Sequence, residues 1–174
     1  MKIIIYGSKY GTTRKYAEEL SRRTGIEVVE YSDIEDINRY DTVIYLGALY
    51  AGSVLGLKKT LNKLRDINNK KVIIATVGLA DPNDEENRKG IKDKIKSQIY
   101  DCIYYRSKIF FLRGAIDYSQ LSLKHKTMMA FINRKVKGMK EEEKTAEIRA
   151  AVETYGKKVD YTDFDALDSI INEI

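Results

Sequence analysis

The chain opens with KIIIYGSKYGTTR (residues 2–14), the stretch that decides the fold. Ile3, Ile4 and Ile5 form an unbroken β-branched run, which favours a strand buried on both faces of a parallel sheet. The loop that follows holds two glycines and three hydroxyl residues, and the residues after it favour a helix. A strand, loop and helix in this order direct backbone N–H groups and hydroxyls at one point, which suits a bound phosphate. A plain turn whose hydroxyls cap the helix explains this stretch equally well.

The length and composition predict one domain spanning residues 1–174. The chain is 43% hydrophobic and 33% charged, which describes a globular protein with a sizeable core. Its apolar runs are too short to cross a bilayer, and no signal peptide is recognisable. The single cysteine, Cys102, excludes a disulfide within the chain and favours a reducing, cytoplasmic location. One histidine and one cysteine are too few for a zinc site.

The chain is basic, with a formal net charge of +5 and an isoelectric point near 9.1. A basic protein attracts nucleic acid, anionic lipid or anionic small molecules. No nucleic-acid-binding module is recognisable in the sequence. We therefore expect no nucleic-acid partner, and charge alone does not choose between the other two classes.

Short apolar strands alternate with helical patterns through most of the chain. Apolar strands without alternation indicate a sheet that is covered on both faces, so the pattern predicts a doubly wound α/β domain with a parallel sheet and helices on both faces. The expected strands are residues 2–6, 26–30, 42–47, 71–77 and 107–112, and the expected helices are 12–23, 54–65, 84–100, 121–138, 141–155 and 163–172.

Three glycine-bearing loops follow three of these strands, at residues 7–13, 47–53 and 78–83. Ligands of such sheets lie beyond the carboxyl ends of the strands, so the three loops predict one shared pocket. The first loop matches neither the G-K-[ST] ending of a Walker A loop nor G-x-G-x-x-G. A phosphate there would be held by backbone amides and hydroxyls rather than by a lysine.

The segment Ser8–Thr13 resembles the phosphate loop of flavodoxins, hydroxyl-x-x-Gly-x-Thr, placed directly after the first strand. The resemblance implies a flavodoxin-like, doubly wound five-stranded parallel sheet in the order 2-1-3-4-5, with FMN at its carboxyl edge. It implies no catalytic side chain and no metal. The cofactor-binding residues that it implies are Ser8, Lys9, Tyr10, Gly11, Thr12 and Thr13 around the phosphate, and Ala48, Leu49, Tyr50, Ala51, Gly52, Gly78, Leu79, Ala80 and Asp81 around the ring.

Within the flavodoxin-like proteins, the chain is most similar to the menaquinone-dependent protoporphyrinogen oxidase branch of bacteria. That resemblance implies electron transfer from an organic substrate to a quinone. The chain differs from the branch in its acidic residues at 81 and 84–86 and in residues 119–123, which lack the aromatics of the oxidase. The motifs that carry the resemblance are Gly11–Ala17, Gly47-Ala48, Gly114–Tyr118 and Tyr161–Phe164.

A basic helical segment near residues 118–140 contains six lysines and arginines and no acidic residue. Met128, Met129, Ile132 and Val136 share one face of the expected helix. A basic amphipathic helix of this kind can make a peripheral contact with an anionic membrane, at the inner face of the membrane for a cytoplasmic protein. The alternative is that the apolar face packs on the sheet and the lysines are solvated.

Three single residues each allow two interpretations. Gly52 can supply the backbone beside the flavin ring, because glycine accepts a positive φ, or it can simply start the helix expected at 54–65. Tyr50 can stack on the ring or be an ordinary surface tyrosine. His125, the only histidine, can bind a ligand or transfer a proton, or it can be a surface residue.

The sequence thus favours an FMN-dependent redox protein. Its basic charge favours an oxidase-like enzyme with a quinone acceptor, because flavodoxins that act as simple carriers are usually acidic. A flavodoxin-like electron carrier that serves a redox partner protein is one alternative. A non-redox binding module that has kept the fold and lost FMN is the other, and the bulky Lys9 and Tyr10 in the loop leave room for it.

Overall fold

In the computed structural model, which describes residues 1–174, five parallel strands form the central sheet in the order β2-β1-β3-β5-β6. Numbered by their place along the chain, the parallel strands follow the order 2-1-3-4-5, which confirms the expected flavodoxin-like topology. A two-residue strand, β4, pairs antiparallel with the end of β3. The strands are β1 (Lys2–Gly7), β2 (Val28–Glu30), β3 (Thr42–Tyr50), β4 (Ser53–Val54), β5 (Lys71–Gly78) and β6 (Ser107–Arg113).

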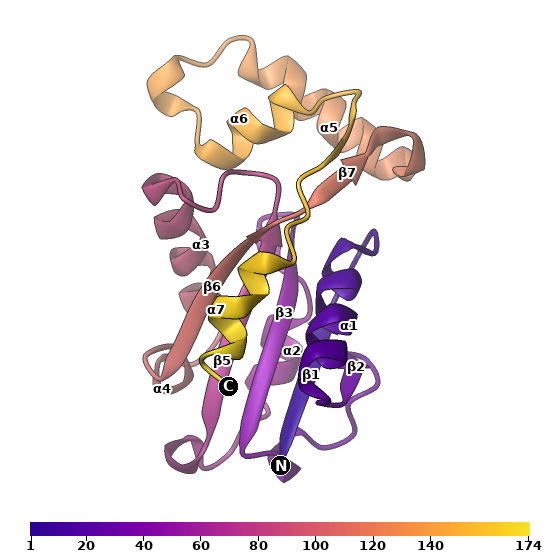
Figure 1. The fold of residues 1–174 in the computed structure, drawn as a ribbon. Helices are drawn as coiled ribbons and strands as arrows, with labels where there is room; N and C mark the ends of the chain where they lie inside the picture. The colour runs from indigo at the N-terminus through magenta and orange to yellow at the C-terminus, as the bar shows by residue number, and fades with distance from the viewer.

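Helices cover both faces of the sheet, because successive strand residues point to opposite sides. Ile4, Ile44 and Ile73 are buried against α1 and α7 on one face. Ile3, Val43 and Val72 are buried on the other face, with α2, α3 and α4. The β-branched runs therefore fill two cores, one on each side (Figure 1). The helices are α1 (Thr12–Thr24), α2 (Leu57–Leu61), α3 (Glu85–Gln98), α4 (Asp101–Tyr104) and α7 (Asp168–Ile171).

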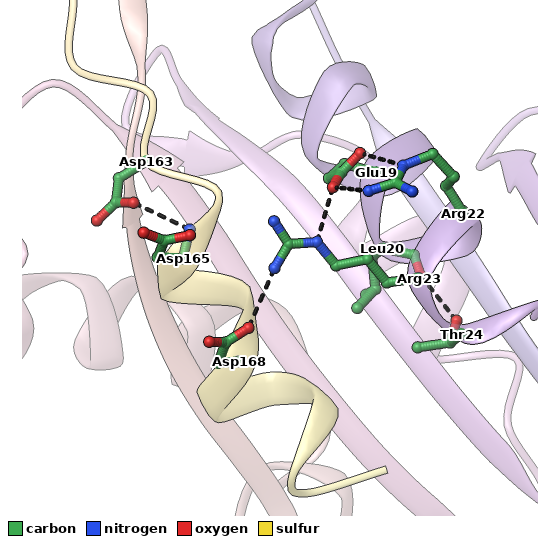
Figure 2. A network of polar contacts seen from close by, with 8 residues as sticks. All are labelled: Glu19, Leu20, Arg22, Arg23, Thr24, Asp163, Asp165 and Asp168. Atoms are coloured by element: carbon green, nitrogen blue, oxygen red, sulfur yellow. Dashed lines mark hydrogen bonds and ion pairs between the residues drawn. The ribbon is translucent and has the colours of Figure 1, made fainter.

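A polar network ties the C-terminal helix α7 to α1 (Figure 2). The Glu19 carboxylate accepts hydrogen bonds from both Arg22 and Arg23. Arg23 also pairs with Asp168 at the start of α7, at 3.1 Å between Nη1 and Oδ1. The two guanidinium groups stabilise the charged carboxylate and lower the pKa of Glu19 to about 2.

A long insertion between β6 and α7 lies beyond the carboxyl ends of the strands, at the top of Figure 1. We call residues 115–160 the cap. Its two ends pair as an antiparallel ribbon, and between them lie two helices that contact each other. The sequence predicts these helices but neither the ribbon nor their position over the sheet edge. The elements of the cap are β7 (Ala115–Asp117), α5 (Leu123–Val136), α6 (Ala146–Glu153) and β8 (Lys158–Asp160).

Backbone and side-chain hydrogen bonds fix both ends of the cap to the sheet. The Gly114 N–H donates to the Gly78 carbonyl at 2.7 Å, and the Tyr161 N–H donates to the Gly114 carbonyl at 3.2 Å. The buried Tyr16 of α1 donates its hydroxyl to the Arg113 carbonyl and accepts from the Asp163 N–H. The two sequence motifs at 114–118 and 161–164 thus mark the places where the chain enters and leaves the cap.

Several expected boundaries are wrong, and the largest error concerns the segment after β3. The helix expected at 54–65 is only α2, because β3 continues to Tyr50 and turns back through Ala51 and Gly52 into β4. The expected helices 141–155 and 163–172 each begin as a separate 3₁₀ turn. The strand expected from residue 26 starts at residue 28 as β2, and the helix expected to end at residue 100 ends at residue 98 as α3. The 3₁₀ turns are Ile37–Arg39, Ile67–Asn69, Tyr118–Gln120, Glu141–Glu143 and Asp165–Leu167. None of the helices has both the length and the apolar character that crossing a bilayer requires.

Candidate functional site

A cavity of about 530 Å³ lies between the carboxyl edge of the sheet and the cap. The three loops predicted to share a pocket form its floor, and α5 and α6 form its roof. Of the fifteen residues predicted around a cofactor, all line this cavity except Gly11 and Asp81. The cavity wall is mostly apolar, and its charged side chains are Lys9 and Glu147.

The first loop leaves the N-terminus of α1 open toward the cavity. Gly11 holds the residue before the helix at a φ of 91°, and no side chain caps the helix. The Ser8 hydroxyl instead accepts from the Gly11 N–H at 3.1 Å, inside the loop. The first helical turn, where Thr12 and Thr13 line the cavity, carries no acidic residue. Its N–H groups and the positive end of the helix dipole therefore remain available for an anion.

This geometry decides one alternative and locates Gly11 relative to the cavity. A plain turn whose hydroxyls cap the helix is wrong, because no side-chain cap is present. Gly11 was predicted among the residues that surround a phosphate, yet it does not line the cavity. Its contribution is conformational, because the left-handed backbone at this position would strain a residue with a Cβ.

The second loop is a tight hairpin rather than an irregular loop. Ala51 and Gly52 have φ values of 49° and 78°, which suit the two-residue turn that joins β3 to β4. The interpretation of Gly52 as the start of a helix is wrong, since α2 begins at Leu57. Tyr50, just before the turn, has the Lys9 ammonium 5.6 Å from its ring centroid and the His125 ring at 4.8 Å. It is therefore packed between the first loop and the cap.

The third loop reaches the cavity through Gly78, Leu79 and Ala80, but not through Asp81. A Cβ at Gly78 would lie 2.6 Å from Leu49 Cδ1, so glycine lets β3 and β5 approach here. Asp81 was predicted at the ring site, and the structure places it outside. Its side chain is exposed and accepts from the Asn83 N–H at 2.8 Å, because the chain turns away from the sheet at this point.

The acidic residues after the third loop anchor the cap. Arg149 of α6 pairs with Glu86 at 2.8 Å and lies 3.9 Å from Asp84, the residue that caps α3. Lys94 of α3 pairs with Glu147 of α6. Asp84 and Glu86 thus have a structural role in this protein.

The apolar face of α5 forms part of the cavity roof. Met128, Met129 and Ile132 line the cavity, and Val136 on the same face is buried. This face lines the cavity and lies beside α6 rather than packing on the sheet. A membrane contact of residues 118–140 stays a prediction. The sequence predicts this apolar face but not its position over the cavity. It also does not predict that Leu121, Ile148 and Ala151 line the cavity.

His125 joins the cap to two of the floor loops. Its Nδ1 lies 2.6 Å from the Tyr10 hydroxyl, and the two rings are stacked with centroids 5.2 Å apart. Tyr50 meets the same imidazole edge-on. Burial and, to a smaller extent, the nearby Lys9 ammonium lower the pKa of His125. The interpretation of His125 as an ordinary surface residue is wrong, since it is partly buried and lines the cavity.

Comparison with known proteins gives one family and several distant structures. The family model described as "Flavodoxin domain" matches residues 3–144. Comparison with curated proteins gives no match. A flavoprotein from Lactobacillus acidophilus in complex with FMN is 15% identical, with 64% of this chain and 91% of that chain covered and a TM-score of 0.42. Fusobacterium nucleatum flavodoxin bound to flavin mononucleotide is 15% identical, with 68% of this chain and 72% of that chain covered and a TM-score of 0.44.

Proposed function

The chain belongs to the flavodoxin domain family, and from this premise we propose that it binds FMN and transfers electrons through it. The observation that carries the proposal is the uncapped N-terminus of α1, which opens into the cavity beside Thr12 and Thr13. A helix N-terminus without an acidic residue in its first turn suits a phosphate monoester. The apolar remainder of the cavity suits a flat aromatic ring.

The residues present fit the parts of FMN without a lysine clamp. The N–H groups of the first turn and the hydroxyls of Ser8, Thr12 and Thr13 would hold the phosphate. Leu49 and Tyr50 on one loop and Leu79 on the other would contact the ring. FMN supplies one- and two-electron transfer when bound, and the protein supplies position and electrostatics.

The test is the spectrum of the purified protein, followed by titration with FMN. We expect a yellow protein with flavin absorbance, or a colourless one that quenches the fluorescence of added FMN at a one-to-one ratio. A colourless protein that takes up no FMN would refute the proposal and favour the binding module that has lost its cofactor.

For the electron acceptor we propose a quinone, in an enzyme similar to the protoporphyrinogen oxidase branch. The apolar roof made by Met128, Met129 and Ile132 supports this, because it provides a surface for a flat apolar molecule next to the predicted ring site. A protein partner would have to reach the cofactor past the cap. The acidic residues 84 and 86 do not count against the branch, because they pair with Arg149 of α6.

Anaerobic assays separate the alternatives. We expect menadione, a water-soluble quinone, to reoxidise the reduced protein rapidly, and protoporphyrinogen to reduce the oxidised protein. Turnover with a ferredoxin-type reductase, together with slow reaction with both small molecules, would show an electron carrier instead. Rapid quinone reduction without reaction with protoporphyrinogen would support the quinone as the electron acceptor and would refute protoporphyrinogen as the electron donor.

We also propose that the outward side of α5 contacts an anionic membrane. Leu123 and Phe131 are 83% and 67% exposed and lie two turns apart on the same side of the helix. Lys124, Arg134 and Lys135 surround them and are exposed. Exposed apolar side chains within a basic patch match the surface of an anionic bilayer, in which the apolar groups enter the interface and the lysines meet headgroups.

Vesicle sedimentation tests this contact. We expect binding to phosphatidylglycerol vesicles that falls with added salt, no binding to phosphatidylcholine vesicles, and at least a tenfold loss in the double variant Leu123→Ser plus Phe131→Ser. Tyr105→Ser is the matched control, because Tyr105 is 69% exposed and lies outside the cap. A wild-type protein that ignores anionic vesicles at low salt would overturn the proposal.

A further inference from the structure

A hydrogen-bonded pair of side chains, Tyr10 and His125, lies on the wall of the cavity. His125, the only histidine of the chain, lines the cavity from the start of α5. Its Nδ1 lies 2.6 Å from the hydroxyl of Tyr10, and Tyr10 is 41% exposed. We propose that Tyr10 and His125 form a proton relay between solvent and the cavity. This role rests on the proposed flavin function and goes beyond it.

The cavity has few other groups that could carry a proton. The part of its roof made by Met128, Met129 and Ile132 is apolar, and its charged side chains are Lys9 and Glu147. Glu147 is paired with Lys94 of α3. Lys9 is held over the Tyr50 ring, and an ammonium group has no lone pair with which to accept a proton. Two-electron oxidation of an organic donor releases a proton and reduction of a quinone consumes protons, so both half-reactions need a group that exchanges protons with solvent.

The chemistry of the pair allows transfer in both directions. With the Tyr10 hydroxyl donating to Nδ1, the other nitrogen, Nε2, carries a hydrogen. Nε2 gives this proton to an acceptor in the cavity, Tyr10 passes its proton to Nδ1, and solvent reprotonates the Tyr10 oxygen. One proton has then moved inward, and Nε2 now has a lone pair. A proton donor in the cavity reverses each step. The imidazole therefore alternates between the form with hydrogen on Nε2 and the form with hydrogen on Nδ1, as donor oxidation alternates with quinone reduction.

The surroundings of His125 favour the neutral imidazole, the form that this relay needs. Burial lowers its pKa, and Lys9 from the first loop adds to the effect. Tyr10 and Tyr50 are the other titratable side chains in contact with the ring. Lys124 and Lys126 flank it on α5, and Glu147 of α6 lines the same cavity.

The first test is the reoxidation of FMN-loaded, photoreduced protein by menadione, followed by stopped flow between about pH 5 and pH 8. We expect His125→Gln to bind FMN as the wild type does, because glutamine keeps a hydrogen-bonding group. We expect it to react ~100-fold more slowly and to lose the pH dependence of the rate, because an amide does not relay protons. Added imidazole should restore much of the rate in His125→Ala and leave the wild-type rate unchanged.

Tyr10→Phe removes the solvent side of the relay and should slow the reaction while FMN stays bound. Tyr155→Phe is the matched control, since Tyr155 is 37% exposed and belongs to the same cap but does not line the cavity. Because the chain has one imidazole, its NMR signal gives the pKa directly, and that pKa should change in Tyr10→Phe but not in Tyr155→Phe.

The outcomes separate this inference from the proposed function. A wild-type protein that binds no FMN would refute both. An FMN-loaded His125→Gln variant whose rate and pH profile match the wild type would refute the relay alone. A slow His125→Ala variant that imidazole fails to rescue would also refute it, because the loss would then be structural.

Discussion

Replacing Thr13 by valine tests whether the N-terminus of α1 is a phosphate site. Thr13 is only 2% exposed, yet it lines the cavity at the first turn of the helix. Valine has nearly the same shape and keeps the backbone N–H, so the change removes one hydroxyl and little else. We therefore expect the fold to persist while the site loses one hydrogen bond to the phosphate.

The size of the effect follows from the charge of the acceptor. A hydrogen bond to a charged group contributes ~1.5–3 kcal/mol. Loss of one such bond should raise the Kd for FMN by about 10- to 150-fold, since ~1.4 kcal/mol is a factor of ten. The assay is fluorescence quenching of FMN on titration with protein that has been freed of flavin. Riboflavin lacks the phosphate, so its Kd should be the same for Thr13→Val and the wild type.

Thr76→Val is the matched control for this experiment. Thr76 is also buried, at 1% exposure, but it lies within β5 and does not line the cavity. Its Kd for FMN should equal that of the wild type. The reasoning is refuted if Thr13→Val retains FMN within about twofold. It is refuted equally if riboflavin and FMN lose the same affinity, because the hydroxyl would then not act on the phosphate.

Three further predictions concern stability and the attachment of the cap. Thr76→Val should raise the free energy of unfolding by about 1 kcal/mol in urea denaturation, because the Thr76 hydroxyl is buried without a hydrogen-bond partner; a lower value would contradict this. Glu19→Gln should make the melting temperature less sensitive to acid (Figure 2). In the wild type, the pairing of the Glu19 carboxylate with Arg22 and Arg23 lowers its pKa to about 2, so the pairing stabilises the fold above about pH 4.5 and this stabilisation is lost as the pH falls toward about 2. Equal acid sensitivity of the two proteins would argue against the network. Arg149→Ala should leave the melting temperature nearly unchanged, because its pairs are exposed, but should speed tryptic cleavage within 124–140; an unchanged cleavage rate would show that the cap is held by other contacts.

The fold was predictable because its signals are local. The isoleucine run at 3–5 and the similar runs in β3 and β5 indicate strands that are buried on both faces, which is typical of a parallel sheet covered by helices. The spacing of glycines and hydroxyls between Gly7 and Thr13 likewise placed a possible anion site directly after the first strand. Both inferences need only the order of residue types along a few turns of chain.

The errors fall where strand pairing or the docking of a segment overrides the local pattern. The sequence predicts a helix that begins at Val54. Instead, β3 continues to Tyr50, and the Ala51-Gly52 turn lets the following residues pair with β3 as β4. The spacing predicts an apolar helix face that includes Met128, Met129 and Ile132, but it does not indicate what this face packs against. Periodicity shows that a face must be buried but not what buries it. Here the ribbon of β7 and β8, joined across more than forty residues of chain, decides the partner.

The residue pattern by itself determined the covered parallel sheet and the loops that meet at its carboxyl edge, since β-branched runs and glycine turns act through neighbouring residues, and the resemblance to flavodoxins supplied the strand order. Only the tertiary structure decided that residues 115–160 form a cap, that α5 roofs the cavity, and that His125 meets Tyr10. The contact between Tyr10 and His125 alone joins residues 115 positions apart. They depend on where a whole segment docks, and that is set by the summed packing of many side chains rather than by any local preference.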